Sequence, residues 1–402
     1  MTDMSKSGGE HEGELGLRNV VRLGYVSLST DLSTEMILGV LPFFIIRDLG
    51  GSAAVLGLIE GLAEAANYLF RVFSGLLTDK IARRKPLVLL GYGLSSISKP
   101  IFAVTSSWSQ ALLVRVTDRA GKGIRTSPRD ALISDSVARS EAGRAFGIQG
   151  ALDQVGAVLG PIIAFAVIPF IGIRGVFWLS FIPAALSVLI LIFFVRDYHG
   201  PVRERSIFKN AREVLDRQFV LLLLALGVFS VGAYDFSFIL LKAGSLGIDT
   251  NYIPLVYAVL NIGTVILGVP AGILADRVGK IPVLGLGYAV FLFTSAVGFS
   301  VVGNPLFGFV IAFLFGSYLA ISDTVQRAII PDFTKPDLKG TAYAIYYTII
   351  GIGAFVANAS FGALWSNISP AAAFQFSVAT ATVGIIALIV FIRMTHESLT
   401  GK

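Results

Sequence analysis

Long apolar blocks are the feature of this sequence that most constrains its fold. Blocks of about twenty residues recur along the chain, the length that a helix needs to cross a hydrocarbon core about 30 Å thick. Apolar residues make up 54% of the chain and charged residues only 14%, whereas soluble domains carry about a quarter charged residues. The sequence therefore predicts an all-α integral membrane protein.

Twelve such blocks are expected to form transmembrane helices. The first six cover residues 20–46, 55–78, 86–106, 109–126, 143–168 and 173–195. The second six cover residues 219–243, 252–275, 281–301, 305–327, 339–365 and 371–393. We expect two pseudo-symmetric six-helix bundles, 20–195 and 219–393, joined by a cytoplasmic linker at 196–218 and flanked by cytoplasmic tails at 1–19 and 394–402.

Basic residues gather in alternate connections between these blocks. Lys80, Arg83, Arg84 and Lys85 follow the second block, and six more basic residues lie in the central linker, whereas loops such as 105–108 are nearly uncharged. Cytoplasmic loops are enriched in Lys and Arg, so both termini and the linker are expected in the cytoplasm of a multi-pass cell-membrane protein. The net charge of +6 therefore reflects membrane topology and not nucleic-acid binding.

The two sets of six blocks repeat each other at a fixed offset. The turn at 75–85 reads G-L-L-T-D-K-I-A-R-R-K and the turn at 272–280 reads G-I-L-A-D-R-V-G-K. Their carboxylates, Asp79 and Asp276, are 197 residues apart (276 − 79). The same offset joins 131–135 to 328–332, which indicates two parallel repeats.

The recurring pattern G-x-x-x-D-[RK]-x-G-x-[RK]-[RK] resembles that of the major facilitator superfamily of secondary transporters, from about residue 20 onward. Ala82 replaces the usual glycine in the first copy, and Ile281-Pro282 replaces the final basic pair in the second. The resemblance implies that the motif gates the cytoplasmic side through Asp79, Arg83, Asp276 and Arg277. Alternatively, these residues only mark topology.

Two further segments carry a resemblance. Gly156, Gly160 and Pro161 in the fifth block match the G-x-x-x-G-P core of the antiporter signature of drug-efflux members. Small residues at this spacing also let two helices pack closely, so either role is open. The segment 115–135, which contains D-R-A-G-K-G-I-R-T-S-P-R-D, resembles a prokaryotic subgroup of these permeases.

Ionisable residues inside the blocks are expensive to bury and are therefore functional candidates. Asp31 and Glu35 share a face of the first block, and Glu60 and Glu64 share a face of the second. Desolvation disfavours a charged carboxylate, so these four are predicted to bind protons, with Arg115 as their counter-charge. The alternative is a compensated salt-bridge network that never titrates.

The charges break the symmetry of the repeat. The offset maps Glu64 to Asn261 and Arg115 to Ala312, so the second half is more neutral and aromatic. We therefore expect proton coupling in the first half and a substrate wall in the second. The predicted substrate cavity comprises Asn67, Arg71, Arg119, Asp153, Tyr234, Asp235, Tyr257, Asn261 and Tyr346.

The sequence predicts a transporter and not an enzyme. Gly121-Lys122-Gly123 is not an ATP-binding loop, because no Ser or Thr follows the lysine, so an ion gradient must supply the energy. Without cysteines, and with His11, His199 and His396 outside the blocks, no metal site or cofactor is expected. The favoured function is proton-coupled export, by antiport and alternating access, of a small organic solute that is cationic or amphipathic, by a monomer.

Other functions stay open at this point. A permease for a metal ion or its chelate would use hard carboxylate ligands. A permease for an anionic metabolite would use Arg71, Arg115 and Arg119. From a different class, a lipid translocase or a transporter-like sensor would share the same helices.

Overall fold

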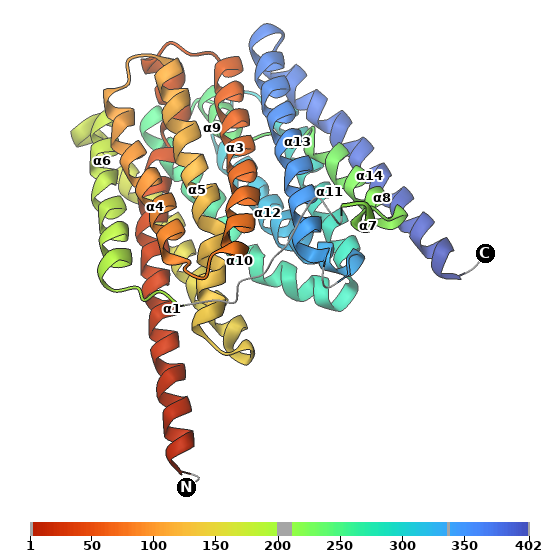
Figure 1. The fold of residues 1–402 in the computed structure, drawn as a ribbon. Coiled ribbons are helices and arrows are strands. Elements are labelled where there is room, and N and C mark those ends of the chain that lie inside the picture. Colours follow the sequence, from red (N-terminus) through yellow and green to blue (C-terminus); the bar gives the residue numbers. More distant parts are fainter. Residues whose placement is uncertain (1–2, 199–210, 336–337, 401–402) are drawn as a thin grey trace. The chain divides into compact units, whose positions relative to one another are not determined.

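The computed structural model describes residues 3–198, 211–335 and 338–400, and the regular elements in these ranges are helical (Figure 1). The first half of the chain forms α1 (Asp3–Leu38), α2 (Leu41–Phe43), a π-helical turn (Phe44–Asp48), α3 (Ala53–Lys80), α4 (Lys85–Ile101), α5 (Trp108–Ser136) and α6 (Ala142–Phe193). The second half forms α7 (Ala211–Val214), α8 (Arg217–Ser230), α9 (Phe236–Ser245), α10 (Ile253–Val278), α11 (Lys280–Ser300), α12 (Leu306–Ile329), α13 (Lys339–Asn367) and α14 (Pro370–Thr400).

The predicted number of transmembrane helices is confirmed. Nine segments of the described ranges are long and apolar enough to span a membrane. One of them, α6, contains two spans, because Gly172 adopts a φ of 66° and interrupts the helix. α5 is long enough at 29 residues but carries many charges, and α8 and α9 together make one more broken span. The described chain therefore has the twelve membrane-spanning helices expected from sequence.

The seventh predicted block, 219–243, is not one continuous helix. It ends as α8 at Ser230 and resumes as α9 after Asp235. The Asp235 carboxylate accepts a hydrogen bond of 2.9 Å from the Ser237 amide, and Asn358 Oδ1 accepts one of 2.7 Å from the Asp235 amide. The prediction of an unbroken helix was wrong here, because a helix cap is invisible to hydropathy.

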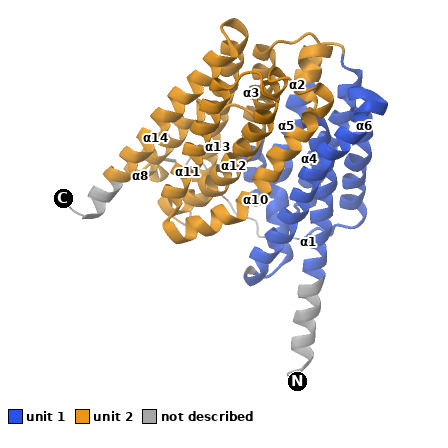
Figure 2. Ribbon diagram, turned by 180° about the vertical axis from the view of Figure 1, so that it is seen from behind, with its two compact units in different colours: residues 1–38, 69–105, 113–205 blue, residues 39–68, 106–112, 206–402 orange. Residues whose placement is uncertain are grey.

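The chain forms two compact units by residue contacts (Figure 2). Unit 1 comprises residues 1–38, 69–105 and 113–205, and unit 2 comprises residues 39–68, 106–112 and 206–402. These contact units differ from the two repeat halves, which stay a prediction from the sequence.

Glycines let the helices of unit 1 approach closely. A Cβ atom on Gly156 of α6 would lie 2.5 Å from the Leu28 carbonyl oxygen of α1, and one on Gly160 would lie 2.8 Å from the Leu32 carbonyl oxygen. Any larger residue would force the backbones apart. The apolar core of this unit draws on α1, α4, α5 and α6 and includes Val20, Leu23, Val26, Val88, Tyr92, Leu132, Ile133, Ala145, Leu191 and Val195.

Aromatic rings fill the interior of unit 2. The ring of Tyr234 lies 4.3 Å from that of Phe361 and 5.2 Å from that of Phe291, measured between centroids. Phe229 stacks on Tyr288. Each aromatic side chain buries a large apolar area, so this cluster is the main source of packing energy that we identify in the unit.

Candidate functional site

A buried lysine occupies the centre of the charged interior of unit 1. Lys99 of α4 is 1% exposed, and its ammonium donates a hydrogen bond of 3.3 Å to the Thr30 carbonyl oxygen of α1. The carboxylates whose charges act on it are Asp118, Asp31 and Glu35. The structure thus groups two of the predicted proton-binding residues around a cation that the prediction left out.

Arg115 of α5 is 1% exposed and pairs within its own helix. Its guanidinium lies 3.4 Å from the Asp118 carboxylate, which also accepts a hydrogen bond of 2.5 Å from Ser95 Oγ. Arg119, predicted to line the substrate cavity, is also buried on α5. A charge this deep is tolerated only when it is paired and hydrogen-bonded, and Asp118 supplies both functions for Arg115.

Asp153 of α6 belongs to the same buried interior. Gln149 Nε2 donates hydrogen bonds to Asp153 Oδ1 at 3.4 Å and to Ser27 Oγ at 3.1 Å. The charges that act on Asp153 include those of Asp31 and Arg129. The residue was predicted to line the substrate cavity, and the structure places it beside Asp31, one of the predicted proton-binding residues.

Two other predicted proton-binding residues lie in unit 2. Glu60 of α3 is fully buried, whereas Glu64, one turn later, is half-buried and accepts a hydrogen bond of 3.1 Å from Asn67. Arg71 of the same helix is half-buried and falls in unit 1. The predicted proton-coupling set is therefore divided, with Asp31, Glu35 and Arg115 in the other unit.

Most of the predicted substrate wall in unit 2 is buried. Tyr234, Tyr257 and Tyr346 are only 3 to 4% exposed. Tyr234 is hydrogen-bonded to Ser295, Tyr257 stacks on Phe236 at 4.7 Å, and Tyr346 donates to Gln326 Oε1 at 2.8 Å. Asn261 is 8% exposed on α10, and Asp235 caps α9. Contact of these residues with a substrate stays a prediction.

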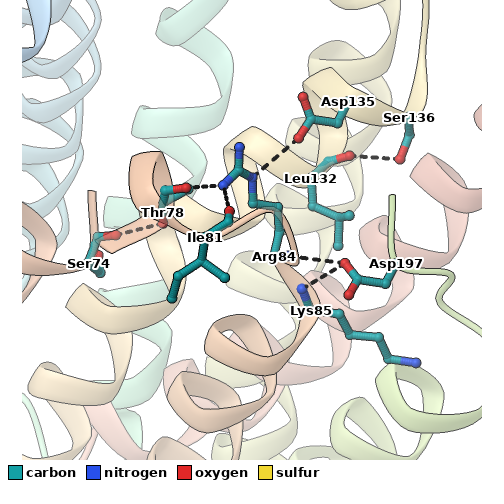
Figure 3. A network of polar contacts seen from close by, with 9 residues as sticks. All are labelled: Ser74, Thr78, Ile81, Arg84, Lys85, Leu132, Asp135, Ser136 and Asp197. Carbon is teal, nitrogen blue, oxygen red and sulfur yellow. Dashed lines mark hydrogen bonds and ion pairs between the residues drawn. The ribbon is translucent and has the colours of Figure 1, made fainter. Parts of the chain in front are cut away.

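Arg84 and Lys85, at the start of α4, contact the ends of three other helices of unit 1, and Figure 3 shows the contacts of Arg84. Its guanidinium donates to the carbonyl oxygens of Thr78 and Ile81 at the end of α3, and it lies 3.4 Å from the Asp135 carboxylate of α5. Asp197 Oδ1 accepts hydrogen bonds from the amides of Arg84 and Lys85, at 3.1 and 3.0 Å, at the start of α4. Lys85 Nζ donates to the Ile192 and Val195 carbonyl oxygens at the end of α6, at 2.9 and 2.7 Å.

The predicted gating residues are less buried than Arg84. Arg83, Asp276 and Arg277 are exposed, and the side chain of Asp79 lies outside the described part of the chain. In unit 2, Lys280 Nζ lies 2.7 Å from the Asp332 carboxylate. The repeat offset places Lys280 opposite Arg83, yet in unit 1 the neighbouring Arg84 makes the corresponding ion pair.

Sequence reasoning missed several of these residues. Asp118 and Lys99 were visible as charges inside predicted helices, but nothing in the sequence indicated that they meet. Asp135 could have been found from the repeat, since the offset joins it to Asp332. Asp197 carries no sequence signal, because its partners are backbone amides.

Known proteins similar to this chain include membrane transporters. The family description "Major Facilitator Superfamily" matches residues 23–244 and 222–401. An uncharacterized MFS-type transporter of Methanocaldococcus jannaschii is 32% identical over 375 residues, covering 91% of this chain and 93% of that protein. The multidrug resistance protein MdtG of Proteus mirabilis is 24% identical over 341 residues, covering 81% and 83%.

A solved structure shares the fold. The crystal structure of an auto-inhibited POT family peptide transporter aligns with a TM-score of 0.79 at 11% identity, covering 94% of this chain and 97% of that one. The helical fold and the family match together define an integral membrane protein of the secondary-transporter class. The chain belongs to the major facilitator superfamily, and it is a transporter and not an enzyme.

Proposed function

We propose that this protein exports a small organic solute across the cell membrane in exchange for protons, with both termini in the cytoplasm. The basic residues of alternate loops support this orientation. Export is supported by a relative named for multidrug resistance, at 24% identity. The prediction that the solute is cationic or amphipathic belongs to this proposal.

The observation that carries the proposal is the buried ionisable cluster of unit 1. The charges of Asp118, Arg125, Asp31 and Glu35 act on Lys99, and Asp153 lies beside Asp31. In a low-dielectric interior, adding one proton to a carboxylate removes a negative charge and changes the electrostatic interactions of the whole cluster. Such a change can bias an equilibrium between two conformations of a transporter.

The cations of α5 favour a second candidate, a permease for an anionic metabolite. Five cations lie along this helix, against the carboxylates of Asp118, Asp130 and Asp135, and they are Arg115, Arg119, Lys122, Arg125 and Arg129. Asp118 pairs with Arg115 and Asp130 pairs with Arg129. An anionic solute would interact favourably with this face. This candidate and the first differ in the sign of charge that the solute carries.

The test uses purified protein in liposomes that contain a pH-sensitive dye. Under an imposed pH gradient, a transported solute should make protons cross the liposome membrane down the gradient. The rate of this proton movement should depend on pH. Asp31→Asn, Glu35→Gln and Asp153→Asn should each flatten that dependence by removing a group that can carry a proton. Asp249→Asn, a helix-cap position on an exposed loop, is the matched control.

Two outcomes decide the proposal. Full pH dependence in all three variants would exclude this cluster as the proton site. Solute movement without proton movement in the unaltered protein would exclude antiport itself. Solutes of opposite charge in the same assay separate the two candidates.

A further inference from the structure

Two oppositely charged residues of α12 are exposed inside a membrane span. Asp323 and Arg327 lie within the span Leu306–Phe333 and are exposed, although a charge that faces lipid is costly. The exposed apolar side chains of this helix are Leu306, Val310 and Phe313. At about 100° per residue, Asp323 points roughly 100° away from their mean direction. Asp323 therefore points away from the exposed apolar side of this helix.

A platform of four tyrosines belongs to the same surface. Tyr347 of α13 stacks on Tyr68 of α3, with centroids 5.7 Å apart and planes at 25°, and on Tyr343, at 6.0 Å and 24°. Tyr346 completes the platform, 5.1 Å from Tyr347. Tyr68, Tyr343 and Tyr347 are half-buried, so part of each ring remains accessible.

Hydrogen bonds hold this platform in place. The Tyr346 hydroxyl donates to Gln326 Oε1 at 2.8 Å, and Gln326 Nε2 donates to the Tyr288 hydroxyl at 3.2 Å. The Tyr343 hydroxyl donates to the Arg327 carbonyl oxygen at 2.7 Å. Both α12 and α13 are thus fixed relative to the rings, which limits the entropy lost when a ligand binds.

The Asp323 carboxylate lies close to these rings. Asp323 precedes Gln326 by three residues of α12, and Gln326 Oε1 accepts the hydrogen bond from Tyr346. The charge of Asp323 also acts on Tyr346. Arg327 lies one turn after Asp323, and its Nε donates to the Asp323 carbonyl oxygen at 2.9 Å. The charge of Asp323 also acts on Arg327. Among the described residues, the Asp323 carboxylate has no ion-pair partner within 4 Å.

A second carboxylate strengthens the negative character of this surface. Glu64 precedes Tyr68 by one turn of α3, so the two side chains differ by about 40° around the helix. Glu64 is half-buried, and its carboxylate is hydrogen-bonded to Asn67 at 3.1 Å. Two carboxylates, Glu64 and Asp323, therefore lie near the rings, together with the guanidinium of Arg327 and that of Arg71, three residues after Tyr68 on α3.

We propose that Tyr68, Tyr343, Tyr346 and Tyr347, with Asp323, form a subsite for a planar aromatic ring that carries a positive charge. A planar ring stacks on tyrosine, and a cation is attracted to the face of an aromatic ring. The Asp323 carboxylate supplies the counter-charge at the edge of the platform. The inference rests on the proposed transport of a small organic solute, and it narrows that solute to planar aromatic cations.

The experiment measures equilibrium binding to the full-length protein in lipid nanodiscs, without any gradient. Ethidium serves as a planar aromatic cation and fluorescein as a planar aromatic anion. Ethidium fluorescence should saturate, and Asp323→Asn and Tyr347→Leu should each weaken its binding about tenfold. Tyr347→Phe, which keeps the ring, should bind within about twofold of the unaltered protein. Tyr252→Leu removes an exposed ring elsewhere and should have no effect.

Several results would overturn the proposal. One is ethidium binding that does not saturate, and another is equal affinity for fluorescein. A third is unchanged affinity in both Asp323→Asn and Tyr347→Leu, which would assign these residues to gating if transport were lost. Because binding needs no proton gradient, ethidium binding together with failed proton exchange would exclude only the coupling proposed above.

Discussion

The interiors of the two units are built from different chemistry. In unit 1, Lys99, Arg115 and Asp118 are almost fully buried, and the Asp118 carboxylate is a counter-charge to both cations. In unit 2, the interior is filled by Tyr234, Phe361 and the rings around them. Buried ion pairs contribute little net stability but respond to every change of charge, whereas packed rings are stable and insensitive to charge. The contrast teaches that one unit is suited to switching and the other to holding its shape.

Removing one carboxylate from unit 1 should have the largest effect. Asp118→Asn keeps the shape of the side chain but leaves Lys99 and Arg115 without their shared counter-charge. We expect a loss of about 3–5 kcal/mol in the free energy of unfolding, measured by denaturant titration in detergent. The double variant Lys99→Met/Asp118→Asn restores the charge balance and should recover part of the loss. An unaltered stability in Asp118→Asn would refute the charge-compensated interior.

The two loop-proximal ion pairs provide an intermediate test. Arg84→Ala removes a buried hub that binds the end of α3 and the Asp135 carboxylate, and should cost about 1.5–3 kcal/mol. Lys280→Ala removes a more exposed pair with Asp332 and should cost about 0–1 kcal/mol. The same unfolding titration compares them. Equal losses would show that burial does not distinguish these two sites.

Removing a single hydroxyl from unit 2 should also have a small effect. Tyr234→Phe keeps the ring contacts with Phe291 and Phe361 and removes only the hydrogen bond of 3.2 Å to Ser295. The expected loss is about 0.5–1.5 kcal/mol, with no change in the pH dependence of transport. Ser295→Ala removes the other partner of that bond and is the matched variant. A pH dependence that changed in Tyr234→Phe would place a titrating role in unit 2.

Much of the fold could be predicted because hydropathy is a local property. Each block of about twenty apolar residues determines a helix, since an unpaired backbone polar group is too costly in hydrocarbon. The kink at Gly172 falls between two predicted spans, 143–168 and 173–195. The break before Asp235 was missed, because it depends on a cap and on Asn358 more than a hundred residues away.

The sequence by itself determined the twelve helices, the superfamily and the presence of costly charges inside the membrane. Only the tertiary structure decided which charges interact: Lys99 with Asp118, Asp153 with Asp31, and Arg84 with Asp135. It also placed Tyr234 in a packed core and Tyr347 on an accessible face. The physical reason is the distance along the chain over which each interaction acts. Burial in lipid acts on each segment separately, whereas ion pairs and ring stacks join side chains from different helices, and their partners are fixed only when the helices pack.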